Sequence, residues 1–567
     1  MSTAHRVIQA SVGAPLGTGT SRQRPVGRIG GVVCVADSSA ASNRLAAALG
    51  PGAQLLNSDT CRLVVDYDCC WRDGRLIYSE DQWQHVLATQ TLGNVQGAFA
   101  LASLASDGTL TLARDAIGER SLFYAIVPGG IVFASTVPAL LASELIGRKL
   151  NRPGIATYLV YAYLPGRETL VEGVYELLPG EMIQFHEGRS ASSRLWSLPA
   201  EPEEWADETI LRDALRARLE VAVRRRLPAG ERVGATLSGG LDSSLVVALA
   251  CRLHDAPVHT YSISFGAGHA NELPFSSLLA EHCRTEHRII ELSPTVVLRY
   301  LDESIALLSD PIGDPLTVPN ALAFREASSE VGIVLNGEGG DPCFGGPKNL
   351  PMLLAELYDG AADEPHARAR SYLRAHLKCY DDLESMLLPD VLEASTLLEN
   401  SLTVHLDDPR WRSFVSKLQG INVAFKGGHH ILPKVDAESA PFGVLARSPL
   451  FDREVVELSF RIPPQLKLRG SVEKYLLKQA VQDLLPRAIL DRPKSGMLVP
   501  VEGWFRGPLR SHARERLLDG LTPYRLFRRD YLERLLDGRL GGLRPRHGAK
   551  IWLLVTLEAW LRGVFAG

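Results

Sequence analysis

The segment LSGGLDSSLVVALA, residues 237–250, constrains the fold of this chain more than any other stretch. An apolar run, VGATL, leads into it, and residues with helical periodicity follow its two adjacent glycines. This order predicts a strand, a tight loop and a helix. The free N–H groups at the start of such a helix, together with its dipole, attract anions. We therefore expect this loop to bind a phosphate group.

The side chains of the loop indicate which phosphate chemistry it supports. Gly239 and Gly240 let the backbone approach the anion closely. Hydroxyl donors come from Ser238, Ser243 and Ser244. Asp242 would repel a phosphate unless a Mg²⁺ ion lay between them, because that ion prefers hard oxygen ligands. No lysine follows the glycines, so this is not the GxxxxGK[ST] loop of kinases and GTPases; a plain tight turn is the alternative.

The chain as a whole predicts two domains, and its fold class is α/β. Residues 1–28 are rich in Ser, Thr, Gly and Arg and are expected to form a flexible tail. Residues 29–198 contain short alternating strands between Asp-Gly and Gly-Gly turns, which are typical of an antiparallel sandwich. A linker, LPAEPEEWADET, follows. Strands alternate with helices in residues 205–567, which end in helices alone, and this predicts a doubly wound parallel sheet with a helical extension.

Composition and charge exclude several classes of function. The 567 residues carry a formal net charge of -4, which gives no electrostatic attraction for nucleic acid or an anionic membrane. No apolar run reaches the roughly 18 residues of a membrane span, and the N-terminus lacks the apolar core of a signal peptide. The eight cysteines form no CxxC pair, which favours reduced thiols. We expect a cytoplasmic protein.

Several motifs carry a resemblance to known proteins. SGGLDSS resembles the pyrophosphate loop of the ATP pyrophosphatases, which cleave ATP between its α and β phosphates. Nearly the whole chain is similar to the asparagine synthetase family, whose motifs appear in order as GAFALA, TLARDAIGERSLFYA, LNGEGGDPCFGG, RSPLFDREVVELSFRIP and EKYLLKQAV. The resemblance implies an N-terminal glutaminase-like sandwich of the Ntn type. It also implies a C-terminal ATP pyrophosphatase domain that uses ATP and Mg²⁺ to adenylate a carboxylate.

The resemblance implies roles for individual residues as well. Asp242 and Asp341 match the two carboxylates that hold Mg²⁺ on the pyrophosphate, and their glycine-rich loops can meet at the C-terminal edge of a parallel sheet. Lys494, in RPKSG, matches a lysine that stabilises developing charge. Glu338 and Glu473 are the other catalytic candidates, with a structural ion pair as the alternative for Glu473. The residues expected to contact ATP or pyrophosphate are Leu237, Ser238, Gly239, Gly240, Asp242, Ser243, Ser244, Ile263, Asn336, Gly337 and Asp341.

The sequence departs from the family in its glutaminase half. A true asparagine synthetase has an N-terminal cysteine as nucleophile, whereas this chain has Gly30, which has no side chain with which to attack. The glutamine-binding stretch reads DGRLIYS, and Cys34 lies further along the strand. We therefore predict no glutaminase activity, so the nucleophile must be an amine that arrives with the substrate. Leu445 in LARSP and Pro342 in GGDPCFGG are further changes near the acceptor pocket.

The leading interpretation is a lasso peptide cyclase, which joins the N-terminal amine of a precursor peptide to an Asp or Glu side chain. Its partners would be that peptide, a leader peptidase and a leader-recognition protein. A β-lactam synthetase is the second candidate, although Glu338 stands where those enzymes have a tyrosine of their base dyad. An ammonia-dependent asparagine synthetase is the third. Outside enzymes, an inactive nucleotide- or peptide-binding scaffold is possible, but Asp242, Asp341 and Lys494 argue against it.

Overall fold

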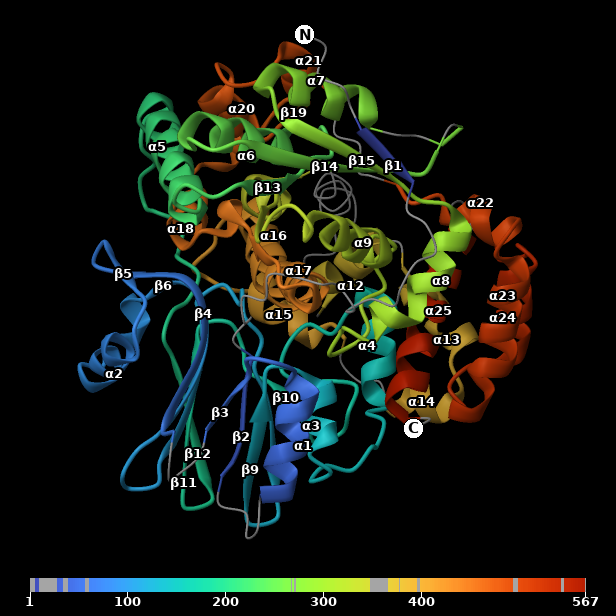
Figure 1. Ribbon diagram of the computed structural model, residues 1–567. Coiled ribbons are helices and arrows are strands. Elements are labelled where there is room, and N and C mark those ends of the chain that lie inside the picture. Colours follow the sequence, from blue (N-terminus) through green and yellow to red (C-terminus); the bar gives the residue numbers. More distant parts are fainter. Residues whose placement is uncertain are drawn as a thin grey trace.

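The computed structural model describes residues 6–9, 28–33, 39–56, 61–266, 268–269, 272–346, 366–376, 378–394, 398–492, 498–541 and 545–565. It contains an antiparallel sandwich and a parallel α/β sheet, as the sequence predicts (Figure 1). In Figure 1 the sandwich lies below the parallel sheet, and helices from the end of the chain stand to the right. None of the helices in the described ranges is long and apolar enough to cross a membrane.

The sandwich consists of two sheets with strand orders β10-β8-β9-β2-β3 and β12-β11-β7-β6-β4-β5. Its strands are β2 (Ile29–Val33), β3 (Gln54–Leu56), β4 (Leu63–Arg72), β5 (Arg75–Ile77), β6 (Gln96–Leu104), β7 (Leu110–Arg114), β8 (Phe123–Val127), β9 (Gly130–Ala134), β10 (Tyr175–Glu176), β11 (Glu181–His186) and β12 (Arg189–Arg194). Apolar side chains from both sheets, such as Ile29 and Leu112, share one buried cluster. Apolar and polar residues alternate along the strands, so the apolar face of each sheet packs into this cluster between the sheets.

Four helices belong to this part of the chain: α1 (Ser39–Leu49), α2 (Glu80–Ala88), α3 (Val137–Ala142) and α4 (Pro153–Tyr161). Both α1 and α3 pack on the sheet that contains β2 and β9. Trp83 of α2 is buried against Phe99 of the other sheet. The sandwich is therefore covered on both outer sides.

The sheet of the other half of the chain is parallel throughout and doubly wound. Its spatial order is β1 (Arg6–Gln9), β15 (Glu286–Glu291), β14 (Val258–Ser264), β13 (Val233–Thr236), β16 (Ile333–Leu335) and β17 (Leu445–Arg447). The chain runs outward from β13 to β15 and then returns to β16 on the other side of β13. Strand order therefore reverses between β13 and β16, where the loops after the strands open on a shared crevice.

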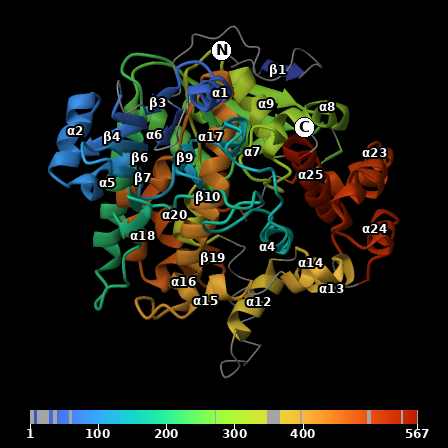
Figure 2. The same ribbon diagram turned by 90° about the horizontal axis from the view of Figure 1, so that it is seen from below.

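Helices pack around this sheet and fill the rest of the chain. Those between the strands are α5 (Glu208–Arg226), α6 (Leu241–Leu253), α7 (Leu273–Cys283), α8 (Pro294–Ile305), α9 (Thr317–Ala327), α10 (Gly340–Phe344), α12 (Ala367–Ala375), α13 (Leu383–Met386), α14 (Pro389–Ala394), α15 (Asn400–Leu406), α16 (Phe414–Ile421), the π-helix η3 (Asn422–Ile431) and α17 (Leu432–Ser439). After β17 come α18 (Arg453–Phe460), α19 (Pro464–Lys467), the hairpin β18 (Leu468–Arg469) and β19 (Val472–Glu473), α20 (Tyr475–Val481), α21 (Arg487–Leu490), α22 (Val501–Arg506), α23 (Arg510–Glu515), α24 (Arg529–Leu536) and α25 (His547–Phe565). Figure 2, the view from below, shows α12, α13 and α14 along one side of the molecule.

Strand β1 corrects the prediction of a flexible tail. Arg6–Gln9 pair in parallel with β15, and Val7 lies opposite Ile289. A four-residue edge strand leaves no periodicity to detect, and its partner lies far away in the sequence. The rest of the segment up to residue 27 lies outside the described residues. The N-terminal segment thus contributes to the sheet of the other half.

The predicted linker does not separate two independent cores. Helix α4, which was expected to belong to the sandwich, is buried in one apolar cluster with α8, α9 and α25. The Tyr158 hydroxyl donates to the Leu553 carbonyl at 2.8 Å. A Cβ at Gly313 would lie 2.3 Å from Leu553 and 3.0 Å from the Tyr158 hydroxyl, so the contact is tight. The two halves therefore share one hydrophobic core.

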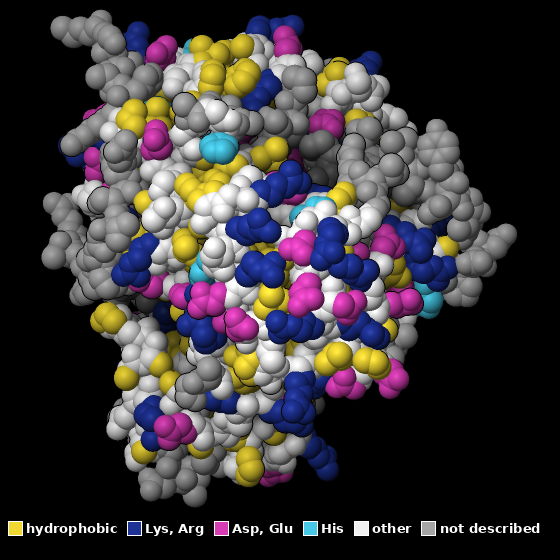
Figure 3. Space-filling model, turned by 90° about the vertical axis from the view of Figure 1, so that its right-hand side faces the viewer, with side chains coloured by type: hydrophobic (Ala, Val, Ile, Leu, Met, Phe, Trp, Pro, Cys, Tyr) yellow, Lys and Arg dark blue, Asp and Glu magenta, His cyan; other side chains and the backbone are white. Residues whose placement is uncertain are grey.

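Basic and acidic side chains lie next to one another on the face that α22 to α24 help to form (Figure 3). Ion pairs on these elements include Arg514 with Asp537 at 3.1 Å and Arg529 with Glu533 at 3.1 Å. This face therefore carries charges of mixed sign. The cysteines that the structure describes are all free thiols.

Candidate active site

The first glycine-rich loop joins β13 to α6, which confirms the predicted strand, loop and helix. The Leu237 amide donates to the Tyr261 carbonyl at 2.8 Å, which fixes the loop to β14. Gly239 has a φ of +76°, and a Cβ there would lie 2.5 Å from the backbone nitrogen of Ser276. Only glycine fits this position. Gly240 is the N-cap residue of α6.

The serine hydroxyl groups lie at the N-terminus of α6. The Oγ atoms of Ser238 and Ser243 are 3.0 Å apart, and the Ser238 amide donates to Ser243 Oγ at 3.2 Å. The Gly240 amide donates to Ser238 Oγ at 3.3 Å. Ser244 is fully buried, and its hydroxyl has no hydrogen-bond partner among the described residues. Hydroxyl groups and the helix N-terminus thus converge where an anion would be stabilised.

The second glycine-rich loop follows β16 and packs directly on the first. A Cβ at Gly340 would lie 2.2 Å from Cγ of Asp242, and a Cβ at Gly337 would lie 2.5 Å from the Ser243 nitrogen. Neither contact tolerates a side chain. The two loops therefore form a single site at the point where strand order reverses.

Asn336 fixes the start of this second loop. Its backbone amide donates to the Arg447 carbonyl of β17 at 3.0 Å. Its side-chain oxygen accepts a hydrogen bond from the Glu338 amide at 3.1 Å. Ile263 is half-buried in β14, beside the strand that leads into the first loop. These predicted nucleotide contacts lie along the edge where the loops emerge, and their roles stay predictions.

Lys474, which sequence reasoning did not select, lies between the two aspartates. Its Nζ is 2.5 Å from Oδ2 of Asp242 and 2.5 Å from Oδ1 of Asp341. The side chain is buried. The backbone of Lys474 has a φ of +52°, in the left-handed region that a lysine rarely adopts. The predicted metal carboxylates therefore converge on one cation.

The neighbouring Glu473 lies in β19. Burial lowers the pKa of Lys478, and the negative charge of Glu473 partly opposes this shift. Lys474, rather than Glu473, is the residue of the EKYLL segment that contacts both aspartates. The sequence did offer one signal: Lys474 lies in the family motif EKYLL, which follows both glycine-rich loops and precedes RPKSG. The catalytic role predicted for Glu473 is not tested by these contacts.

Arg492, the second residue of DRPKSG, contacts the first loop. Its Nη1 donates to the Gly239 carbonyl at 3.2 Å, and its Nη2 donates to Glu272 Oε1 at 2.6 Å. The guanidinium also lies 4.2 Å from the ring centroid of Phe275. Lys494, two residues further along the chain, lies outside the described residues. Its predicted role stays a prediction.

A buried polar cluster lies near Glu338. Asp314 Oδ2 is 2.6 Å from Lys434 Nζ and 3.5 Å from His430 Nε2. Lys434 and Glu438 both lie on α17 and are almost fully buried. The charge of Glu338 acts on both of them. The cluster therefore extends from α17 towards the second glycine-rich loop.

Burial and charge set the protonation of this cluster. Burial opposes ionisation of Asp314, but Lys434 and the bond from His430 hold the pKa of Asp314 well below its usual range. Burial lowers the pKa of His430 to about 4, so its imidazole is neutral at neutral pH. Burial also raises the pKa of Glu438 well above its usual range, against the opposing charge of Lys434. The site thus combines a charged pair with a carboxyl group that favours its protonated form.

The position predicted to replace the glutaminase nucleophile is closed. A Cβ on Gly30 would lie 2.3 Å from Leu45 Cδ2 and 2.9 Å from Leu49 Cδ1, both on α1. A Cβ on Gly31 would lie 2.8 Å from the ring of Phe133. Cys34 lies outside the described residues. Neighbouring side chains therefore occupy the space that a nucleophile on β2 would need.

Comparison with known proteins identifies the family. The model of the asparagine synthase family matches residues 214–562, and that of the glutamine amidotransferase domain matches residues 83–196. A putative glutamine-hydrolyzing asparagine synthetase of Mycobacterium bovis is 27% identical over 519 residues, which cover 84% of this chain and 78% of that protein. Glutamine-hydrolyzing asparagine synthetase 1 of Bacillus subtilis is 23% identical over 503 residues, 83% and 78% of the two chains.

A third relative has a different name. The carboxyethyl-arginine β-lactam synthase of Streptomyces clavuligerus is 25% identical over 463 residues, which cover 81% of this chain and 74% of that protein. All three relatives extend over both halves of the chain. Because the asparagine synthase model matches more than half of the residues and both glycine-rich loops fall within the match, the chain belongs to the asparagine synthase family.

Proposed function

We propose that this protein is an ATP- and Mg²⁺-dependent ligase that closes an isopeptide bond within a precursor peptide, as a lasso peptide cyclase does. An Asp or Glu side chain of the peptide would attack the α phosphate of ATP and release pyrophosphate. The peptide's N-terminal amine would then attack the acyl carbon and expel AMP. Ligases of the asparagine synthase family form carbon–nitrogen bonds at the expense of ATP, which supports the general reaction.

The observation that carries the ligase proposal is the convergence of Asp242 and Asp341 on one cation position. Two carboxylates together with phosphate oxygens are a usual ligand set for Mg²⁺, so these residues fit the ion. Bound by these carboxylates beside Lys474, Mg²⁺ would neutralise charge on the pyrophosphate leaving group. Lys474 would add a second positive charge, and the N-terminus of α6 would supply N–H donors.

The closed position at Gly30 supports an amine that belongs to the substrate. A chain without a glutaminase nucleophile has no ammonia of its own making. Binding both ends of one peptide makes the attack intramolecular, and good orientation in such reactions is worth up to about 7–11 kcal/mol. The attacking amine must also lose a proton, and Glu338, three residues before Asp341, is the carboxylate nearest in sequence to the metal site. We propose Glu338 as that base.

A β-lactam synthetase type of cyclase is the second candidate. The similarity to the Streptomyces clavuligerus enzyme favours it, because that name also describes ring closure. Both candidates need an internal amine, so substrate size distinguishes them. For the peptide candidate we also propose action in the cytoplasm, with a leader peptidase and a leader-recognition protein as partners.

The experiment is mass spectrometry of a leader-free core peptide with N-terminal Gly and an internal Asp or Glu, incubated with ATP, Mg²⁺ and the leader peptidase. We expect the peptide to lose one water while AMP forms. Aspartate with ammonia, and small β-amino acids, should give neither AMP nor product. AMP formation with a small amino acid but never with the peptide would overturn the lasso assignment and leave the ligase intact.

The metal site has its own test. Asp242→Asn and Asp341→Asn should each abolish AMP formation, because each removes one carboxylate from the Mg²⁺ ligands. Both variants should stay folded, as judged by circular dichroism. The control is Asp255→Asn, which changes an exposed carboxylate beyond the end of α6 and should leave AMP formation unchanged. Near-normal AMP release by both site variants would show that these residues do not hold the metal.

A further inference from the structure

The sandwich holds the continuous helical segment η3–α17 at two points. At the first, Glu176 Oε2 is 2.7 Å from His429 Nδ1. Arg114 binds Glu176 at 2.7 Å and also donates to the Gly428 carbonyl at 3.0 Å. These side chains are buried. The segment is therefore tied to β7 and β10 just before α17 begins.

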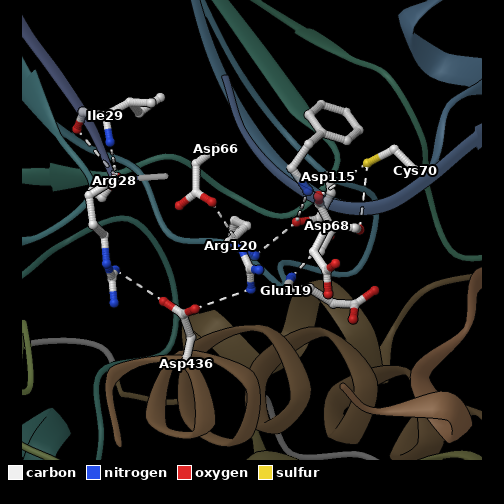
Figure 4. Close-up of polar contacts among 12 residues, drawn as sticks. Arg28, Ile29, Asp66, Asp68, Cys70, Asp115, Glu119, Arg120 and Asp436 are labelled. Carbon is white, nitrogen blue, oxygen red and sulfur yellow. Dashed lines mark hydrogen bonds and ion pairs between the residues drawn. The ribbon is translucent and has the colours of Figure 1, made fainter. Parts of the chain in front are cut away.

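The second point is Asp436, which binds two arginines of the sandwich half (Figure 4). Its Oδ2 is 3.0 Å from Nη1 of Arg28, and its Oδ1 is 3.1 Å from Nη1 of Arg120. Arg120 is held in turn by Asp66 of β4 at 3.1 Å. Side-chain exposure in this set is 13% or less. Removing one partner of such a buried ion pair leaves an uncompensated charge, so the loss of this contact is strongly destabilising.

The contacts of Asp436 and the polar cluster of Asp314, Lys434 and Glu438 lie on opposite faces of α17. Lys434 and Glu438 are four residues apart and lie on one face of α17, whereas Asp436 is two residues from each and points the opposite way. Lys434 binds Asp314, while Asp436 binds the sandwich. One face of α17 thus carries the charged residues of the polar cluster. The opposite face carries Asp436, which binds the sandwich.

Apolar packing does not complete this interface. A cavity beside the ion pairs is lined by both halves, including Arg28, Ser135, Asp310, His429 and Asp436. Polar side chains line part of this cavity, so apolar packing is interrupted there and the ion pairs of Asp436 hold α17 beside it.

We propose that Asp436 is a positioning residue. Through it the amidotransferase-like half, whose nucleophile position is closed, holds α17 so that Lys434 and Glu438 face Asp314 and Glu338. The consequence for turnover rests on the proposed function, because it assumes that a substrate binds at this cluster. The placement of α17 does not rest on it.

Hydrogen–deuterium exchange of Asp436→Asn tests the placement. Exchange in residues 422–439 should become about tenfold faster, because the loss of both ion pairs of Asp436 favours local opening. Exchange in α6 should not change. The matched control is Asp68→Asn, which breaks another buried pair between the halves, with Arg447 at 2.7 Å, whose side chains bind no residue of α17. If Asp436→Asn does not fold, Arg28→Gln removes only one of the two partners of Asp436 and serves in its place.

Kinetics test the consequence. Asp436→Asn should leave ATP affinity unchanged and lower the rate of amide formation, and Asp436→Glu should restore part of that rate. Unchanged exchange in residues 422–439, or equal loosening by Asp68→Asn, would overturn the proposal. So would a loosened segment with a wild-type rate of amide formation. If wild-type protein forms no amide at all, the proposed function fails, and the exchange comparison alone decides the placement.

Discussion

At the scale of the residue, Lys474 determines the charge of the candidate site before any ligand binds. Two carboxylates that approach one position repel each other, and the ammonium group between Asp242 and Asp341 offsets this repulsion. The left-handed backbone of Lys474 costs on the order of 1–3 kcal/mol. The first glycine-rich loop indicated Asp242, and the family resemblance implied the role of both aspartates. Lys474 lies in the EKYLL motif, but its burial between the aspartates depends on where α20 packs, which the sequence does not show.

Lys474→Met tests whether the positive charge of Lys474 matters at this position or only the volume of its side chain. We expect AMP formation to fall by roughly 10²–10³, the usual cost of removing one electrostatic donor. Without nucleotide, Mg²⁺ should raise the melting temperature of this variant more than that of the wild type, because the aspartates have lost their cation. Lys478→Met, on the same helix, is the control for both measurements. Wild-type AMP formation and an unchanged response to Mg²⁺ would mean that Lys474 only fills space.

At the scale of the element, the two glycine-rich loops interlock. Gly340 follows β16, yet its neighbour in space is the carboxyl group of Asp242 on α6. The first loop could be predicted because strand, glycines and helix lie next to one another in the sequence. Strand β1 could not, because its pairing partner β15 lies far along the chain and four residues show no period. The sequence therefore predicted elements that follow one another along the chain. It did not predict the pairing of strands that are distant in the sequence.

Gly340→Ala should displace Asp242, since the added Cβ would lie 2.2 Å from its Cγ. Overpacking of this kind costs about 1–3 kcal/mol, measurable by urea unfolding. AMP formation should fall as well, because the aspartate moves. Gly332→Ala is the control: no atom lies within 4 Å of a Cβ there, so we expect a change in unfolding free energy of less than about 1 kcal/mol. Equal stability of the two variants would contradict the close approach of the loops.

At the scale of the whole molecule, the two halves are joined by ion pairs and by packing. Arg447 binds both carboxylate oxygens of Asp68 at 2.7 Å, and Asp436 binds Arg28 and Arg120. The sequence predicted the sandwich and the parallel sheet, since each has its own local pattern. It did not predict that α4 joins the other half, because a boundary drawn from composition does not reveal which surface a helix covers.

Gly30→Cys should not create a glutaminase. The added side chain would meet Leu45 at 2.3 Å and Leu49 at 2.9 Å, so the variant should be less stable than the wild type by about 1–3 kcal/mol. Release of glutamate from glutamine should stay at background for both proteins, and Gly30→Cys with Leu45→Ala should recover part of the lost stability. Glutamate release that a thiol reagent blocks would show that another cysteine acts as nucleophile.

Helix α4 gives the amidotransferase-like half a part in the packing of the other half, whether or not it hydrolyses glutamine. Removing the domain would also remove α4 and leave the apolar faces of α8, α9 and α25 open to water. Exposed patches of that kind promote aggregation. The amidotransferase-like half therefore has a structural role that does not depend on glutamine hydrolysis.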